Sequence, residues 1–200
     1  MEALYNKILA EGQNLGQGIL KIDSFLNHQV DTALMEAIGR EIARRFVAVS
    51  PSRILTAEVS GIVPAVMAAR ALGNIPVVYA RKHKPITMQE PVYLETAPSH
   101  TKGGDVYLMV SPEFLHSGER VLIVDDFLAS GRTIEALACI VRNAGATLVG
   151  IATVVEKTFE GGREALAHWR VPIEAMARIT DMSDGKIVME KYGSRYNHHS

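Results

Sequence analysis

The sequence predicts an α/β protein built on a mostly parallel, twisted sheet with helices on both faces. Residues 121–124 are four consecutive apolar residues without alternation, which is typical of a strand covered on both faces. Segments with strand and helix character alternate along most of the chain, as they do in βαβ units. With 200 residues, 48% of them hydrophobic and 22% charged, the chain can bury one substantial core. We therefore expect a single domain spanning residues 1–200.

The first half of the chain contains the elements of one βαβ unit. Asp31 is a residue type that favours the N-cap, and apolar residues recur at helical spacing from residue 34 to residue 46. Residues 54–57 predict a strand, residues 64–72 a helix and residues 77–80 a second strand.

The second half repeats the same alternation. Thr133 opens a helical pattern that stops at Gly145, after the strand at residues 121–124. Residues 148–155 predict another buried strand, residues 163–169 a short helix and residues 173–179 a final core strand.

The remaining segments lack this regular pattern. Residues 84–118 carry four prolines and the Gly103-Gly104 pair, which predicts a mobile hairpin or loop. We expect residues 1–30 and 180–200 to contribute to a small hood beside the sheet. The two histidines near the end of the chain predict a disordered tail rather than a metal site.

The composition excludes several classes of protein. The formal net charge of −1 argues against binding to nucleic acid or to an anionic membrane, and no apolar stretch approaches the roughly 20 residues of a membrane helix. No signal peptide is recognisable, so we expect a cytoplasmic protein. The single Cys139 lies on the apolar face of the predicted helix, and we expect it in the core.

Residues 121–133, VLIVDDFLASGRT, form the most informative segment of the chain. Asp125 and Asp126 follow the buried strand directly, and small residues then lead into a helix. The free N–H groups at a helix N-terminus attract a phosphate monoester. Adjacent carboxylates can accept hydrogen bonds from two neighbouring hydroxyls, such as those of a ribose. The segment therefore predicts a site for ribose 5-phosphate.

Other interpretations of the segment remain open. It lacks the Lys of a Walker loop and the three-glycine spacing of a dinucleotide fingerprint. The simplest structural alternative is that Asp126 caps a turn and that the two acids are only solvated. Another alternative is a phosphoacceptor or metal site formed by the acid pair.

Two further loops follow strands of the predicted sheet, at the edge where open α/β sheets bind ligands. Residues 58–64 form a small-residue turn into a helix that has Pro64 near its start, which again leaves N–H groups for an anion. Residues 81–84 are the basic run Arg-Lys-His-Lys. Clustered cations beside two anion loops can neutralise a phosphorylated ligand, although a solvated charge run is the usual interpretation.

The thirteen residues 121–133 resemble the phosphoribosyl pyrophosphate signature of the type I phosphoribosyltransferases. The resemblance implies that Asp125 and Asp126 hold the ribose hydroxyls and that a loop wraps the 5-phosphate. It implies pyrophosphate contacts from the turn before Pro64 and from the basic run, with Asp125, Asp126 and Lys82 as the catalytic residues. The implied phosphate and pyrophosphate contacts are Ala129, Ser130, Gly131, Arg132, Thr133, Ser60, Gly61, Lys82 and Lys84. Arg132 departs from the small or uncharged residue expected in the loop, so its side chain should point outward or add a phosphate contact.

Two other segments, residues 20–29 and 156–164, resemble the bacterial members of this family that act on xanthine. The resemblance implies that Leu20, Asn27 and Lys157 line the purine pocket. An amide donor and an ammonium suit the two carbonyl oxygens of xanthine, and we hypothesise that the amide of Asn27 binds the 2-oxo group. Alternatively, Asn27 is only a turn residue before a helix, and Lys157 is only a surface cation.

The resemblance also implies the reaction and its requirements. The expected activity is transfer of the 5-phosphoribosyl group from phosphoribosyl pyrophosphate to xanthine, giving xanthosine 5′-monophosphate and pyrophosphate. Mg²⁺ is the implied cofactor, bound mainly through the donor substrate, and a homodimer is implied. Lys102 is the cation of a possible closing lid. The alternatives are a preference for guanine or hypoxanthine and a non-catalytic regulator that senses phosphoribosyl pyrophosphate.

Overall fold

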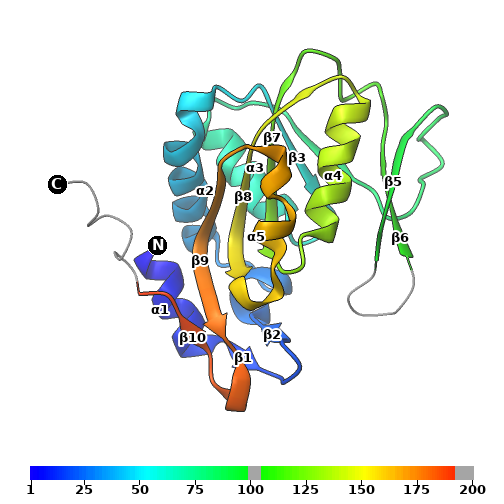
Figure 1. The fold of residues 1–200 in the computed structure, drawn as a ribbon. Coiled ribbons are helices and arrows are strands. Elements are labelled where there is room, and N and C mark those ends of the chain that lie inside the picture. The colour runs from blue at the N-terminus through cyan, green and yellow to red at the C-terminus, as the bar shows by residue number, and fades with distance from the viewer. Residues whose placement is uncertain (99–104, 192–200) are drawn as a thin grey trace.

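The computed structural model describes residues 1–98 and 105–191, and its centre is a six-stranded sheet (Figure 1). The strand order is β10-β9-β8-β7-β3-β4, and every neighbouring pair is parallel except β10 and β9. The strands are β3 (Arg53–Ala57), β4 (Val77–Ala80), β7 (Arg120–Leu128), β8 (Thr147–Lys157), β9 (Ile173–Asp181) and β10 (Val188–Met189). The predicted mostly parallel sheet is confirmed.

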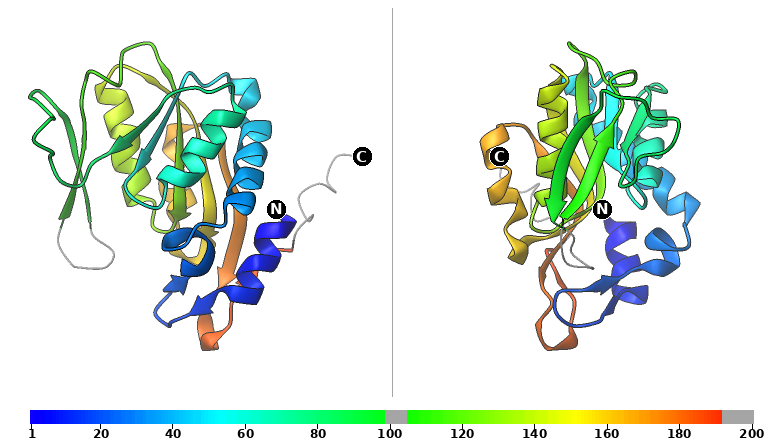
Figure 2. Two further views of the ribbon diagram at one scale, coloured as in Figure 1. Left: turned by 180° about the vertical axis from the view of Figure 1, so that it is seen from behind. Right: turned by 90° about the vertical axis from the view of Figure 1, so that its right-hand side faces the viewer.

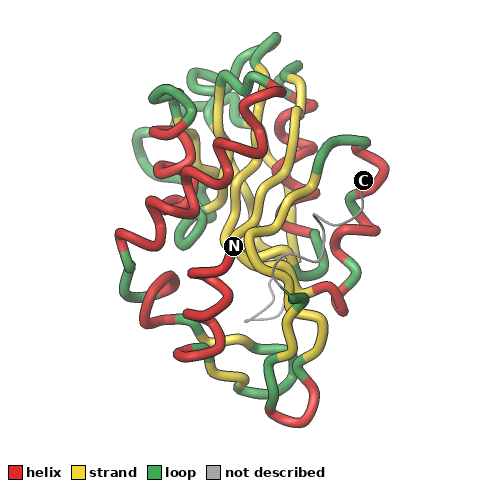
Figure 3. Tube along the Cα trace, turned by 90° about the vertical axis from the view of Figure 1, so that its left-hand side faces the viewer, coloured by secondary structure: helices red, strands yellow, loops and turns green. Residues whose placement is uncertain are grey.

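Helices cover both faces of this sheet, as the edge-on view in Figure 2 and the tube in Figure 3 show. α2 (Thr32–Phe46) and α3 (Ile62–Ala71) pack together and bury their apolar sides with Ile54, Leu122 and Val154. On the other face, α4 (Arg132–Asn143) and the residue after α5 (Gly162–Ala165) pack on a second core cluster. Successive buried residues of β7 belong alternately to the first and the second core cluster, because successive side chains of a strand point to opposite faces.

Several predicted elements are present with shifted ends. The Asp31 carboxylate accepts the Leu34 N–H at 3.0 Å and begins α2, as its residue type predicts. The two predicted strands after α4 extend beyond their apolar runs. Polar residues at the ends of β8 continue its parallel ladders, whereas Asp181 at the end of β9 pairs antiparallel with Val188 of β10. The predicted helix at residues 163–169 consists of α5 followed by a 3₁₀ turn at Ala167–Trp169.

The N-terminal segment lies at the carboxyl ends of the parallel strands (Figure 1). It contains α1 (Glu2–Glu11), β1 (Gln13–Asn14), β2 (Leu20–Lys21) and a π-helical turn at Asp23–Asn27. The Asn14 side chain donates to the carbonyls of Met182 and Lys186, at 2.7 and 2.8 Å. The segment around Asn14 and residues 182–186 therefore lie side by side.

The proline-rich middle of the chain contains the expected hairpin, formed by β5 (Tyr93–Pro98) and β6 (Asp105–Val110). It is joined to the main sheet by an antiparallel bridge between Arg81 and Met109. Lys102, the predicted lid cation, lies outside the described residues, and so does the terminal histidine pair.

The prediction for Cys139 is wrong. Its side chain is only half-buried, and its Sγ lies 3.8 Å from Glu135 Oε1 and 3.5 Å from Arg142 Nη2. Residues four apart share a face of a helix, and Glu135 therefore places Cys139 on the polar edge of α4 rather than in the buried stripe. Among the described residues, no helix combines the length and the apolar character needed to cross a membrane.

Candidate active site

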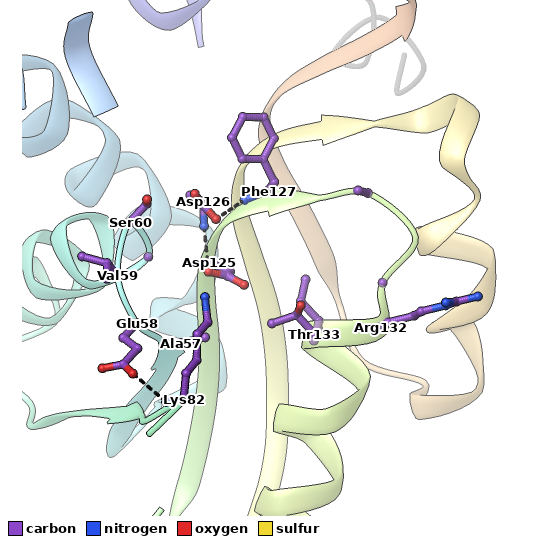
Figure 4. Close-up of a pocket in the computed structure, with 14 residues that line it drawn as sticks. Ala57, Glu58, Val59, Ser60, Lys82, Asp125, Asp126, Phe127, Arg132 and Thr133 are labelled. Carbon is purple, nitrogen blue, oxygen red and sulfur yellow. Dashed lines mark hydrogen bonds between the residues drawn. The ribbon is translucent and has the colours of Figure 1, made fainter. Parts of the chain in front are cut away.

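The three loops selected from the sequence meet around one cavity of about 180 Å³ (Figure 4). The cavity lies at the carboxyl ends of β3, β4 and β7, where the topology of an open α/β sheet favours a ligand. Its lining includes Glu58, Ser60, Gly61, Lys82, Asp125, Asp126, Phe127, Ala129, Gly131, Arg132 and Thr133.

The paired acids are held at the end of β7. Asp125 is 5% exposed and accepts the Asp126 N–H at 3.0 Å, and Asp126 accepts the Phe127 N–H at 2.9 Å. Burial, reinforced by the neighbouring Asp126 charge, raises the pKa of Asp125 well above its usual value, although the charge of Lys82 opposes the shift. Burial also raises the pKa of Asp126. Both carboxylates keep free acceptor positions, so they are suited to receive hydroxyl groups.

The small-residue loop after β7 leads into the N-terminus of α4. Gly131 occupies the N-cap with φ +82°, a conformation that glycine adopts without a steric penalty. Ala129, Gly131 and Thr133 line the cavity, whereas Ser130 lines a neighbouring one. Arg132 is exposed, and Figure 4 shows its side chain directed away from the acid pair. The outward orientation is one of the two that the sequence allowed.

The second anion loop connects β3 to α3 and touches the acid pair. A Cβ atom on Gly61 would lie 2.5 Å from Asp125 Oδ1 and would also collide with Thr56 Oγ1. Only glycine therefore permits this approach of the loop to the acid. The peptide bond between Glu58 and Val59 is cis. Ser60 and Gly61 lie on the cavity wall, as expected.

The two predicted lysines of the basic run occupy different surroundings. Lys82 lines the cavity, and Figure 4 shows its ammonium directed toward Asp125. Lys84 forms an ion pair with Glu90 and does not line the cavity. A pyrophosphate contact from Lys84 stays a prediction.

The three residues predicted to bind the base do not line the cavity, but Asn27 and Lys157 contact residues that do. Asn27 Nδ2 donates to Asp126 Oδ2 at 3.0 Å, although the two residues are 99 positions apart. Lys157 Nζ donates to the Gly18 carbonyl at 2.7 Å and lies 5.5 Å from the ring centroid of Phe127. Leu20 is buried on β2. Asp126 and Phe127 therefore connect this cluster to the cavity.

Several residues at the site were not assigned from the sequence, among them Phe127, Gly162 and Glu58. Phe127 lines the cavity. It was not assigned because an aromatic residue beside a core strand usually has only a packing role. Gly162 packs against the loop before α4, since a Cβ there would collide with the Ala129 carbonyl and lie 2.8 Å from Gly131 N. Glu58 lines the cavity with a negative charge. The sequence held one signal for Glu58: an acidic residue is unexpected in a loop that is predicted to bind an anion.

The site combines paired acids, a helix N-terminus and a second small-residue loop beside a lysine, an arrangement that is suited to a phosphorylated ribose. A family model described as a phosphoribosyl transferase domain matches residues 27–174. The chain therefore belongs to the phosphoribosyltransferase family.

Individual relatives match nearly the whole chain. A xanthine phosphoribosyltransferase of Deinococcus deserti is 47% identical over 193 residues, which are 96% of this chain and 100% of that protein. A xanthine phosphoribosyltransferase of Latilactobacillus sakei is 45% identical, over 94% of this chain and 96% of that protein. Among solved structures, an adenine phosphoribosyltransferase from Rhodothermus marinus has a TM-score of 0.71 at 25% identity, over 90% of this chain and 100% of that chain.

Proposed function

We propose that this protein is a pentosyltransferase of purine salvage that transfers the 5-phosphoribosyl group from phosphoribosyl pyrophosphate to xanthine. The products are xanthosine 5′-monophosphate and pyrophosphate. The observation that carries the proposal is the cavity in which the acid pair, the N-terminus of α4 and Lys82 converge. The names of the relatives, which match this chain over nearly its full length, support xanthine as the acceptor.

Different lining residues bind different parts of the donor substrate. Asp125 and Asp126 accept the ribose hydroxyls, and the N–H groups of residues 129–133 bind the 5-phosphate. The loop with Ser60 and Gly61 holds the pyrophosphate, and Lys82 neutralises its charge as it leaves. Positive charge develops at C1′ of the ribose in this step. Catalysis therefore rests on holding both substrates in line and stabilising the leaving group, without a covalent enzyme intermediate.

Mg²⁺ fits the chemistry of this site as a cation carried mainly by the substrate. Among the residues that the structure describes, no three His, Cys, Asp or Glu side chains gather as a metal site of their own. Asp125 and Asp126 are the protein carboxylates that would face a cation bound to the ribose and pyrophosphate oxygens. Such a cation supplies charge neutralisation of the leaving group.

The base is bound by Leu20, Asn27 and Lys157. Xanthine presents carbonyl oxygens at positions 2 and 6, which suit an amide donor and an ammonium. Guanine replaces the 2-oxo acceptor with a donor and hypoxanthine lacks it, so each would leave a donor of the site unpaired. The ammonium of Lys157, whose side chain is 14% exposed, stands beside Phe127 at the end of β8.

The direct test supplies the purified protein with phosphoribosyl pyrophosphate and Mg²⁺ and one of four bases: xanthine, guanine, hypoxanthine or adenine. Ultraviolet absorbance reports nucleotide formation. We expect the largest kcat/KM with xanthine. A larger kcat/KM with guanine or hypoxanthine would change the assigned base. If the protein bound phosphoribosyl pyrophosphate but formed no nucleotide with any of the four bases, the result would favour the non-catalytic regulator.

Asn27→Ala tests the assignment of the base-binding amide. We expect the preference for xanthine over hypoxanthine to fall by at least about fivefold, because an unmade hydrogen bond to the 2-oxo group costs about 1 kcal/mol or more. We also expect a higher KM for phosphoribosyl pyrophosphate, since Asn27 donates to Asp126. The measurement is kcat/KM for both bases. Asn143→Ala, which removes an exposed amide of α4 that donates to Glu95, is the matched control, and an unchanged base preference in Asn27→Ala would refute the assignment.

The homodimer belongs to the same proposal. An apolar face near the edge strand β4 exposes Ile86 fully and leaves 56% of Phe114 and 42% of Tyr79 exposed. Beside these residues lies a groove of about 440 Å³. A second copy that covers this face would remove it from water, and sedimentation equilibrium would then return twice the mass of the chain.

The proposed place of action is the cytoplasm.

A further inference from the structure

Glu58 presents a difficulty for a site that binds an anionic donor. It follows β3 directly and lines the cavity together with Ser60 and Lys82. A carboxylate exposed to pyrophosphate would repel it. The side chain is only 16% exposed, however, and its oxygens are engaged by the basic run.

Both oxygens of Glu58 contact consecutive residues of that run. Oε1 accepts the backbone N–H of Lys82 at 2.6 Å, and Oε2 lies 2.8 Å from Nε of Arg81. The Arg81 Nε–H has no hydrogen-bond partner among the described residues, so this second contact is an ion pair without hydrogen-bond alignment. The Glu58 N–H also donates to the Ala80 carbonyl at 3.1 Å, which ties the starts of the two loops together.

Arg81 is itself fixed from two other sides. Its backbone exchanges two hydrogen bonds of 2.9 Å with Met109 on β6, and its guanidinium lies 5.8 Å from the ring centroid of Tyr79. Glu58 therefore joins the second anion loop, between β3 and α3, to the basic run at the point where the β5–β6 hairpin is attached.

The position of Lys82 depends on this junction. Figure 4 shows the Glu58 carboxylate at the backbone of Lys82, while the Lys82 ammonium extends in the other direction toward Asp125. The charge of Lys82 acts on Asp125, which places the ammonium within electrostatic range of the acid pair. One end of Lys82 is therefore fixed by Glu58, and the other end faces the reacting centre.

We propose that Glu58 is a positioning residue that fixes the backbone of Lys82 and so aims its ammonium at the pyrophosphate leaving group. Arg81 neutralises the Glu58 carboxylate, and Lys82 keeps its charge available for the ligand. The inference rests on the proposed function, because it assigns pyrophosphate to this side of the cavity. In this role Glu58 acts through Lys82 rather than by binding a substrate.

The experiment measures binding of Mg²⁺-pyrophosphate and, separately, of ribose 5-phosphate by titration calorimetry. Glu58→Ala and the similarly sized Glu58→Met both remove the acceptor, and we expect each to weaken pyrophosphate binding by about tenfold. Ribose 5-phosphate binding should change less than about twofold, since the acid pair and the loop before α4 are untouched. Glu58→Gln keeps an acceptor for the Lys82 N–H and should retain most of the parental affinity.

A double-mutant cycle separates positioning from a general structural role. In a Lys82→Ala background, Glu58→Met should weaken pyrophosphate binding no further, because the group that it positions is gone. Equal losses in both backgrounds, or parental pyrophosphate binding in Glu58→Met, would overturn the inference. Glu36→Met, at an exposed acid of α2, controls for loss of a surface charge. A parent that binds pyrophosphate and ribose 5-phosphate but transfers to no base would count against the proposed function alone.

Discussion

Replacing Asp125 and Asp126 together by Asn is expected to raise the KM for phosphoribosyl pyrophosphate by at least about a hundredfold. A hydrogen bond to a charged group contributes about 1.5–3 kcal/mol, and the substitution weakens two of them. Asn keeps an oxygen that can accept the backbone N–H groups of Asp126 and Phe127, so the end of β7 should retain its conformation. Steady-state kinetics at saturating xanthine give the measurement.

The same substitution should stabilise the folded protein at neutral pH. Burial raises the pKa of Asp125, so the folded state disfavours its ionised form. For a carboxyl whose folded pKa is raised, stability declines as the pH rises from the unfolded pKa of about 3.9 through the folded pKa, and the full penalty remains above it. The amide side chains of the variant cannot ionise, so the gain in free energy of unfolding over the parent should grow with pH. We would measure urea denaturation at pH 4 and pH 7.

The two results together distinguish a binding role from a structural one. A variant that loses affinity for the donor while gaining stability has lost a ligand contact, not its fold. An unchanged KM for phosphoribosyl pyrophosphate would refute the assignment of the acid pair. A loss of stability at pH 7 would contradict the burial argument instead. Asp181→Asn, an exposed acid that caps a turn near residue 183, serves as the control.

The sheet and the loop before α4 could be predicted because their signals are local. An unbroken apolar run marks β7, Asp31 marks the start of α2, and small residues before a helix mark the loop. Each follows from backbone preference and burial within a few consecutive residues. Cys139 shows the limit of this approach, because a pattern of apolar spacing does not specify where the buried stripe of α4 ends.

The contacts between the loops could not be predicted, because they depend on which strands become neighbours. Asn27 meets Asp126 across 99 positions of the chain, and Gly162 packs under the loop at Ala129. Glu58 contacts the basic run only because β3 and β4 pair in register, with Ala57 opposite Ala80. The sequence therefore indicates which residue types are present, whereas sheet register determines which of them touch.

Glu156 is a buried acid whose loss should cost considerable stability. It is 1% exposed, its Oε1 accepts Arg163 Nε at 2.8 Å, and its Oε2 accepts Arg163 Nη2 and Arg178 Nε at 2.5 and 3.0 Å. Removing one partner of a buried ionic cluster leaves uncompensated charge and costs about 3–5 kcal/mol. We therefore expect Glu156→Gln to lower the free energy of unfolding by about that amount at pH 7, measured by urea denaturation.

The pH dependence of this loss has a defined sign. Burial works against ionisation of Glu156, but the hydrogen bond from Arg163 and the charges of both arginines outweigh it and lower its pKa. The stabilisation is present above the unfolded pKa of about 4.3 and is lost as the pH falls through the folded pKa. The difference between parent and Glu156→Gln should therefore shrink in acid. Glu36→Gln, which breaks an exposed pair with Arg40, should cost at most about 0.5 kcal/mol.

The position of Glu156 connects this stability to activity. It precedes Lys157, the proposed base contact, and it binds Arg163, which follows the Gly162 that packs against the loop at Ala129. The ionic cluster thus connects the proposed base contact to the loop proposed to bind the 5-phosphate. Where Glu156→Gln remains folded, we expect KM to rise for both xanthine and phosphoribosyl pyrophosphate. The reason is that a displaced α5 would move Gly162 away from the loop at Ala129. If KM rose for neither substrate, the ionic cluster would stabilise only the core.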